Sequence, residues 1–197
     1  MKRMFRIIFL SIFLSFVFTI TYSNPFKASA EIVAIAGDID DDGDDPRSVA
    51  EIIVQEVLDA VGSSSSFIVR AARIPNAAAA VANGKKYILY NPYFMAALQE
   101  ATGSNRWVAV AVLAHEIGHH LIGHTSTHTT SVPESELEAD AFSGYVLRRM
   151  GASLEDAQLA IRALASKRES STHPARNDRI LAIAIGWQKA DRELAIN

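Results

Sequence analysis

The chain has 197 residues, a formal net charge of -3 and no cysteine. This length, together with a hydrophobic content of 49%, is typical of one domain with a substantial core. The lack of cysteine excludes disulfides, thiolate zinc sites and cysteine nucleophiles, so any metal would be held by nitrogen and oxygen. The sequence shows no basic stripe, which argues against nucleic acid as a partner.

The first 30 residues have the pattern of an export signal. A basic start precedes an apolar run over residues 7–20, and the small residues A-S-A at 28–30 offer a cleavage site. This pattern predicts a secretory signal peptide over residues 1–30, or a membrane anchor if it is not cleaved. In both cases we expect an exported protein, periplasmic or secreted, that contacts the membrane only through this segment.

An acidic linker is expected over residues 31–45. Its run at 38–45 begins like the D-x-D-x-D-G start of a calcium loop, but Val49 stands where such a loop needs its bidentate glutamate. The run is therefore interpreted as a solvated linker, with a calcium- or partner-binding export protein as the rival reading. Residues 46–197 are expected to form the functional domain.

The spacing of apolar residues in that domain predicts an α+β fold. It indicates a helix over 46–61, with Pro46 in its first turn, and a short strand at 67–70. Residues 77–81 and 85–90 flank Asn83-Gly84, the strongest short-range hairpin signal, so we expect a small antiparallel sheet. The rest is predicted to be helical, over 92–101, 105–123, 134–149, 154–168 and 175–194.

The motif H-E-I-G-H at 115–119 carries the main chemical signal. Four residues make about one helical turn, so His115 and His119 lie on one face and can bind a single zinc ion. Glu116 lies about 100° round the helix, where it can reach an activated water as a general base without being a ligand.

The third ligand is not a histidine of the metzincin type. That class requires glycine and histidine at the eighth and eleventh positions of the motif, where Ile122 and Thr125 stand. A glutamate from a second helix is the other common solution, and Glu134, Glu136 and Glu138 are the candidates.

Two of the acidic side chains share a helix face. Glu136 and Asp140 are four residues apart, so one of them could bind zinc while the other orients a ligand histidine. Glu138 points elsewhere and is the fallback ligand. For Glu134 and Glu138, solvated surface charge is the simpler reading.

Three blocks together resemble a known family. H-E-I-G-H at 115–119, E-L-E-A-D at 136–140 and T-H-P at 172–174, with Arg179 beyond, are similar to the metallopeptidase family of the CAAX prenyl protease and HtpX, which has soluble exported members. The resemblance covers most of the C-terminal half. It implies a zincin-like single domain of the gluzincin type with one zinc ion per chain.

The resemblance also implies roles for individual residues. It makes Glu136 the third zinc ligand with Asp140 in support, and it places His173 and Arg179 near the catalytic site. It also includes His124 in the family's extended H-E-x-x-H-x-x-x-x-H pattern, where we expect a structural role for it. His173 could then donate a hydrogen bond to an oxyanion, cap the zinc, or be a loop residue satisfied by backbone. Arg179 could hold a carboxylate or the loop.

The function expected from these residues is zinc-dependent endopeptidase activity on exported or envelope proteins. An extended protein or peptide substrate is expected to pair with a strand edge at residues 87–90. The alternative is a zinc-binding envelope chaperone or assembly factor with latent or no peptidase activity, in which His128 or His173 blocks the metal. A pure binder has no need for Glu116. The membrane chamber and prenylated substrates of the integral membrane relatives are not expected, because no hydrophobic span follows the N-terminus.

Overall fold

The structure is a computed structural model, and it describes residues 48–125, 132–165, 167–168 and 173–196. The predicted signal peptide, the acidic linker and His128 lie outside the described residues. Within the described ranges, no helix has both the length and the apolar character needed to cross a membrane.

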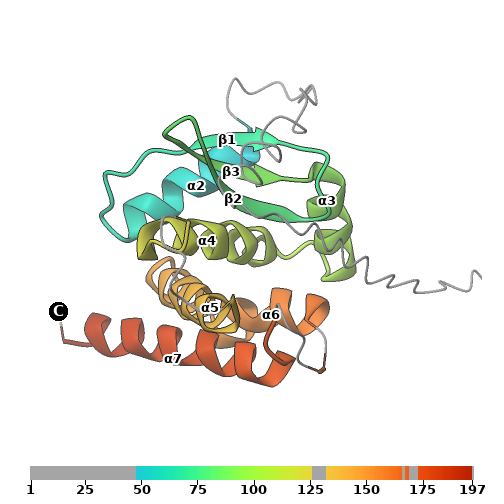
Figure 1. Cartoon of the computed structure of the whole chain (residues 1–197). Helices are drawn as coiled ribbons and strands as arrows, with labels where there is room; N and C mark the ends of the chain where they lie inside the picture. Colours follow the sequence, from blue (N-terminus) through green and yellow to red (C-terminus); the bar gives the residue numbers. More distant parts are fainter. Residues whose placement is uncertain (1–47, 126–131, 166, 169–172, 197) are drawn as a thin grey trace, which may run out of the picture.

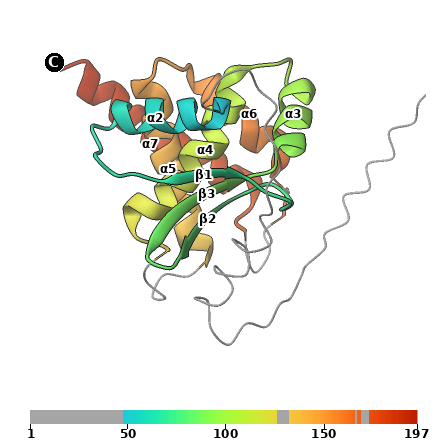
Figure 2. The same ribbon diagram turned by 90° about the horizontal axis from the view of Figure 1, so that it is seen from above.

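Helices dominate the described residues, and the strands form one small sheet on one side of a central helix, α4 (Figure 1). The helices α5 and α7 lie on the other side of α4, and the view from above shows α2 and the sheet side by side over it (Figure 2). The coarse prediction of a helix-rich α+β fold is therefore confirmed. In chain order the elements are α2 (Val49–Ala60), β1 (Ile68–Ala71), β2 (Ala77–Ala82), β3 (Lys85–Tyr90), α3 (Pro92–Ala101), α4 (Arg106–Ile122), α5 (Val132–Arg149), α6 (Leu154–Leu164) and α7 (Arg176–Leu194).

The sheet is mixed, so the prediction of an antiparallel sheet is wrong for one strand. β2 and β3 form the predicted hairpin, in which Asn83 (φ 51°) and Gly84 (φ 71°) both adopt the left-handed conformation that a two-residue turn requires. β3 then inserts between β2 and β1. Because β1 and β2 run in opposite directions, β1 is parallel to β3.

The strand order also changes which strand can accept a partner. β3 is paired on both sides, so the predicted free edge at residues 87–90 is wrong. β2 is an edge strand, and it is the strand that contacts α4 most.

A capping box and an extended residue explain two shifted helix ends. α2 begins at Val49, not at Pro46, because Ser48 and Glu51 form a reciprocal capping box. α6 ends at Leu164, short of the predicted residue 168, because Ala165 turns to an extended conformation with ψ 140°.

α4 is the centre of the core. Its apolar face buries Val110, Leu113 and Ile117 completely, against residues of α2, the sheet and α5. The helix that carries the H-E-x-x-H motif is thus held from several sides, which makes it a rigid base for a site.

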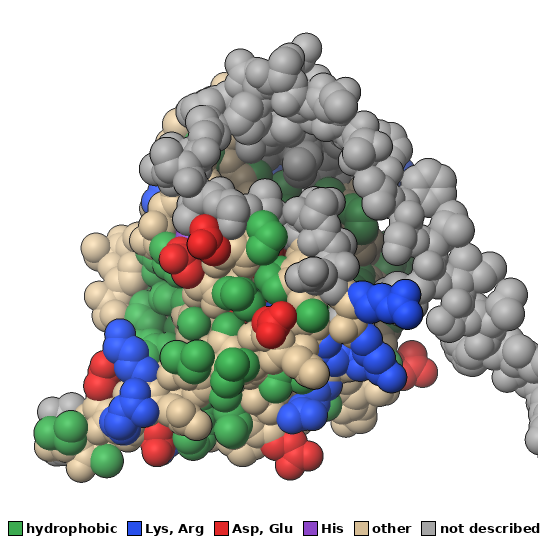
Figure 3. Space-filling model, turned by 60° about the horizontal axis from the view of Figure 1, so that its bottom comes forward, with side chains coloured by type: hydrophobic (Ala, Val, Ile, Leu, Met, Phe, Trp, Pro, Cys, Tyr) green, Lys and Arg blue, Asp and Glu red, His purple; other side chains and the backbone are tan. Residues whose placement is uncertain are grey.

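Glycines set the distance between α5 and α7. A Cβ atom added at Gly144 would overlap the carbonyl oxygen of Ile183, and one at Gly186 would overlap that of Ala141. The two backbones therefore touch, and this contact fixes the middle of α7 beside the middle of α5. The outer face of α7 exposes Leu181 (59%), and apolar side chains lie among charged ones on this side of the molecule (Figure 3).

Candidate metal centre

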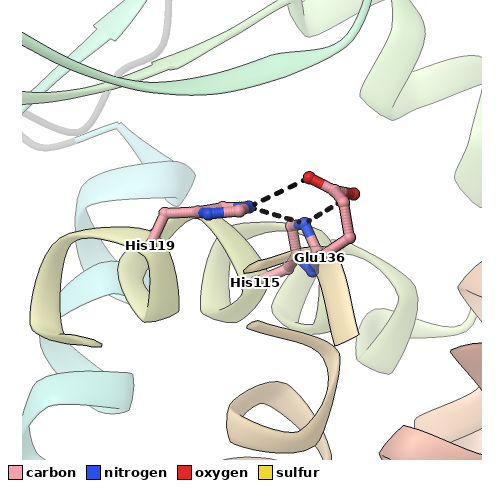
Figure 4. Close-up of side chains that lie close together, drawn as sticks. All are labelled: His115, His119 and Glu136. Atoms are coloured by element: carbon pink, nitrogen blue, oxygen red, sulfur yellow. Dashed lines mark hydrogen bonds and ion pairs between the residues drawn. The ribbon is translucent and has the colours of Figure 1, made fainter. Parts of the chain in front are cut away.

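Three side chains from α4 and α5 converge beneath the sheet (Figure 4). The Nε2 atoms of His115 and His119 lie 3.1 Å apart. Oε1 of Glu136 lies 3.3 Å from Nε2 of His119, and its Oε2 lies 3.6 Å from Nε2 of His115. Among the described residues, these three form the one group of His, Cys, Asp or Glu side chains placed to hold a metal ion.

The spacing of these atoms fits a zinc ion. Zinc bonds to nitrogen and oxygen are about 2.0–2.1 Å long, so the edges of a tetrahedral site are about 3.3 Å. The distance of 3.1 Å between the two Nε2 atoms, and the distances of 3.3 and 3.6 Å from them to the two different oxygens of Glu136, lie close to this value. Two imidazoles and one carboxylate also form a common donor set of catalytic zinc sites, which keep a fourth position open.

The site carries an excess of negative charge. Burial by itself lowers the pKa of His115, but contacts with Asp140 and Glu136 outweigh it and raise that pKa to about 10. Burial by itself raises the pKa of Glu136, but hydrogen bonds from His115, His119 and His173 hold it far below the usual range. Carboxylates therefore draw a proton onto His115, and a metal cation would satisfy the same field.

Asp140 and Arg179 support the first ligand. The Asp140 carboxylate is buried and accepts hydrogen bonds from Nε and Nη2 of Arg179 at 2.6 and 2.8 Å. Its Oδ1 lies 3.0 Å from Nδ1 of His115. That buried Nδ1 makes no well-aligned hydrogen bond, so the contact with Asp140 is an ion pair. A small rotation of the imidazole would align the two groups for a hydrogen bond. Arg179 thus holds a carboxylate, one of the two roles expected for it.

The edge strand holds Glu116. Oε2 of Glu116 accepts a hydrogen bond from the backbone N–H of Ala79 at 2.8 Å. Along an antiparallel pair of strands, residues whose backbone groups bond to the partner strand alternate with residues whose groups point away from it. The N–H of Asn91 donates to the carbonyl of Asn76, and with this register the N–H of Ala79 points away from β3. Sequence reasoning missed this contact, since a backbone donor leaves no residue signature.

His173 lies at the rim of the site. Its Nδ1 is 3.3 Å from Oε2 of Glu136, and its side chain is 61% exposed. The structure therefore brings His173 to the ligand carboxylate, just before α7 begins.

The other acidic candidates lie outside the three-residue group. Glu138 is 52% exposed and contacts Nε2 of His124 at 2.7 Å. Glu134 is also exposed. The fallback assignment of Glu138 as ligand is thus not the arrangement of this structure, which places Glu136 at the histidines.

His120 is a buried histidine that sequence reasoning did not single out. Burial lowers its pKa, so the ring is neutral. Nε2–H donates to the carbonyl oxygen of Tyr87 at 2.8 Å, and Nδ1 accepts from the hydroxyl of Thr125 at 3.1 Å. The ring also stacks on Phe67. His120 therefore ties α4 to the sheet and is not part of the metal group.

The fold and the site together define a helix-rich α+β domain with a half-buried cluster able to hold a metal ion. No protein-family model, curated protein or solved structure matches the chain. Its function has to be inferred from the chemistry of this cluster.

Proposed function

We propose that the protein is a zinc-dependent endopeptidase with a zincin-like fold. The observation that carries the proposal is the convergence of His115, His119 and Glu136 within 3.1–3.6 Å of one another, with Glu116 as the neighbour of the first ligand. A site built only to store metal has no use for this additional carboxylate.

The residues divide the work of peptide hydrolysis. His115, His119 and Glu136 would hold the zinc ion, which would supply a Lewis acid for the scissile carbonyl and for the attacking water. The Glu116 carboxylate takes a proton from that water as the water oxygen bonds to the carbonyl carbon. It then passes the proton to the leaving amine nitrogen as the C–N bond breaks. His173 is the rim side chain that we assign to hydrogen bonding with the oxyanion.

β2 is the strand to which we assign the substrate. It is an edge strand, whereas β3 has no free edge. The N–H of Ala79 is bonded to Glu116, and the other outward backbone groups of β2 can pair with an extended peptide. Pairing through the backbone tolerates many sequences. The substrates that fit are therefore extended segments of protein chains, and the N-terminal signal pattern points to exported or envelope proteins.

We further propose membership of the family of the CAAX prenyl protease and HtpX, among its soluble exported members. The contacts of Asp140 with Arg179 and His115, and of His173 with Glu136, support this proposal, because they join its three sequence blocks in one site.

The second candidate is a zinc-binding envelope chaperone or assembly factor with latent or no peptidase activity. It is favoured by one observation, the contact of His173 with Glu136 at the rim, from which the imidazole could occupy the open position of the metal.

Zinc content and casein cleavage, measured on the purified protein and on Glu116→Gln, test the proposal. We expect one zinc ion in both proteins and a loss of activity of about 10²–10⁴-fold in the variant. Zinc in both proteins with cleavage by neither would instead support the chaperone. Absence of zinc from both would refute the metal site.

A further inference from the structure

His124 lies against the second ligand although it is not in the metal group. α4 ends at Ile122, and Gly123 adopts φ 100°, a left-handed conformation that turns the chain back along the helix. This turn brings the imidazole of His124 to the edge of the His119 ring, with 5.1 Å between the ring centroids. The His124 side chain is only 7% exposed.

His124 links His119 to Glu138 through two hydrogen bonds whose donors and acceptors can be assigned. Nδ1 of His119 lies 3.0 Å from Nδ1 of His124, and Nε2 of His124 lies 2.7 Å from Oε2 of Glu138. A carboxylate only accepts hydrogen bonds, so the proton of a neutral His124 sits on Nε2 and its Nδ1 is an acceptor. His119 must then carry its proton on Nδ1, which leaves the Nε2 lone pair directed at the metal position.

We propose that His124 and Glu138 are positioning residues that fix the tautomer and orientation of His119 for metal binding. This inference rests on the metal site of the proposed function. Metal-bound histidines generally donate their other ring N–H to a carboxylate or carbonyl, and such outer contacts tune affinity. Here the role of that outer group is taken by a second imidazole, with the carboxylate one step further out.

The two ligand histidines are thus supported in different ways. His115 faces the buried charge of Asp140 directly, whereas His119 reaches Glu138 through His124. Glu138 is half exposed, so its charge is screened by water. Removing the His124 acceptor should therefore weaken metal binding more than neutralising Glu138.

The test is a zinc titration against a chromophoric chelator. The variants are His124→Leu, which removes the acceptor, His124→Asn, whose amide oxygen can replace Nδ1, and Glu138→Gln. The control is Glu56→Gln, because Glu56 has a similar exposure of 41% and likewise one charged partner, Arg106 at 2.6 Å.

We expect His124→Leu to weaken zinc binding by about 10–100-fold, the range for outer-shell changes at metal sites. His124→Asn should recover part of this loss, Glu138→Gln should show a smaller one, and Glu56→Gln should show none. The absorption spectrum of the Co²⁺-substituted protein should shift in His124→Leu, because the geometry at His119 changes.

Three outcomes separate the possibilities. If His124→Leu and Glu138→Gln bind zinc as tightly as the unmodified protein, the inference is overturned while the metal site stands, even if their metal-free forms melt at lower temperature. If the unmodified protein binds no zinc, the proposed function itself fails. If His124→Leu does not fold, Glu138→Gln decides the matter, and unchanged zinc affinity in that variant overturns the inference.

Discussion

Neutralising Asp140 should separate the stability of the site from its affinity for metal. The carboxylate is 1% exposed, and its partner Arg179 is 12% exposed. Asp140→Asn keeps the shape of the side chain but removes the charge that balances the guanidinium. Burial by itself lowers the pKa of Arg179, and Asp140 raises it, yet an isolated arginine stays charged in proteins. The substitution therefore removes the closer of the two carboxylates that face the buried guanidinium, and the remaining one, Glu136, lies 3.5 Å from its Nη2.

The size of the effect follows from this imbalance. Removing one partner of a buried ion pair costs about 3–5 kcal/mol. For a chain of this length, about 1 kcal/mol shifts Tm by roughly 2–4 °C, so the metal-free Asp140→Asn protein should melt about 6–20 °C lower. Zinc affinity should also fall by about 10–100-fold, because the group that faces Nδ1 of His115 loses its negative charge.

The assay is calorimetric unfolding in chelator, followed by zinc titration of the same samples. The double variant Asp140→Asn with Arg179→Met removes both charges, so it should regain much of the lost stability. It should not regain zinc affinity, because His115 still lacks its carboxylate. The reasoning is refuted if Asp140→Asn melts within about 2 °C of the unmodified protein, or if the double variant restores both properties.

Two further outcomes are expected. Ala79→Pro should keep the fold and the zinc, because its N–H faces away from β3, but kcat should fall about 10-fold or more as Glu116 loses its charged hydrogen bond. The matched control, Ala80→Pro, removes an N–H that faces β3 and should unfold the sheet. Full activity of Ala79→Pro would contradict the role of the Ala79 amide. The pKa of His115 is raised to about 10, so this residue is protonated in the metal-free protein at neutral pH. Zinc must displace that proton, so calorimetry in two buffers should show about one proton released per zinc ion bound. The zinc affinity should also rise with pH towards about 10. Zinc binding without proton release would refute the protonation of His115.

Helical spacing predicted the pairing of the two histidine ligands. His115 and His119 are one turn apart, and the structure places their Nε2 atoms together. The turn residues Asn83 and Gly84 likewise predicted the hairpin, because few other residues adopt φ above zero at both positions.

The direction of β1 and the identity of the edge strand could not be predicted in the same way. Alternation of buried and exposed residues has no direction along the chain, so it does not distinguish a parallel neighbour from an antiparallel one. The hydrogen bond from Ala79 to Glu116 depends on which face of the ladder is unpaired, and that follows only from the strand order.

Glu136 and Glu138 illustrate a choice that the sequence left open. Two residues apart on a helix means about 200° of rotation, so the two carboxylates approach the site from different sides. Glu136 reaches the Nε2 side of His119, and Glu138 reaches its Nδ1 side through His124. The close contact of α4 with α5 at Gly118, where an added Cβ would lie 3.3 Å from the backbone of α5, makes both approaches possible.

The charges of the inner site explain why a divalent cation suits it better than a proton. Glu116, Glu136 and Asp140 bring three negative charges, and Arg179 offsets one of them. With neutral histidines the site therefore carries about two uncompensated negative charges in a half-buried setting, where uncompensated charge is costly. A proton on His115 neutralises one, whereas a zinc ion neutralises both and also satisfies the two Nε2 lone pairs. Electrostatics and ligand spacing thus favour the same occupant.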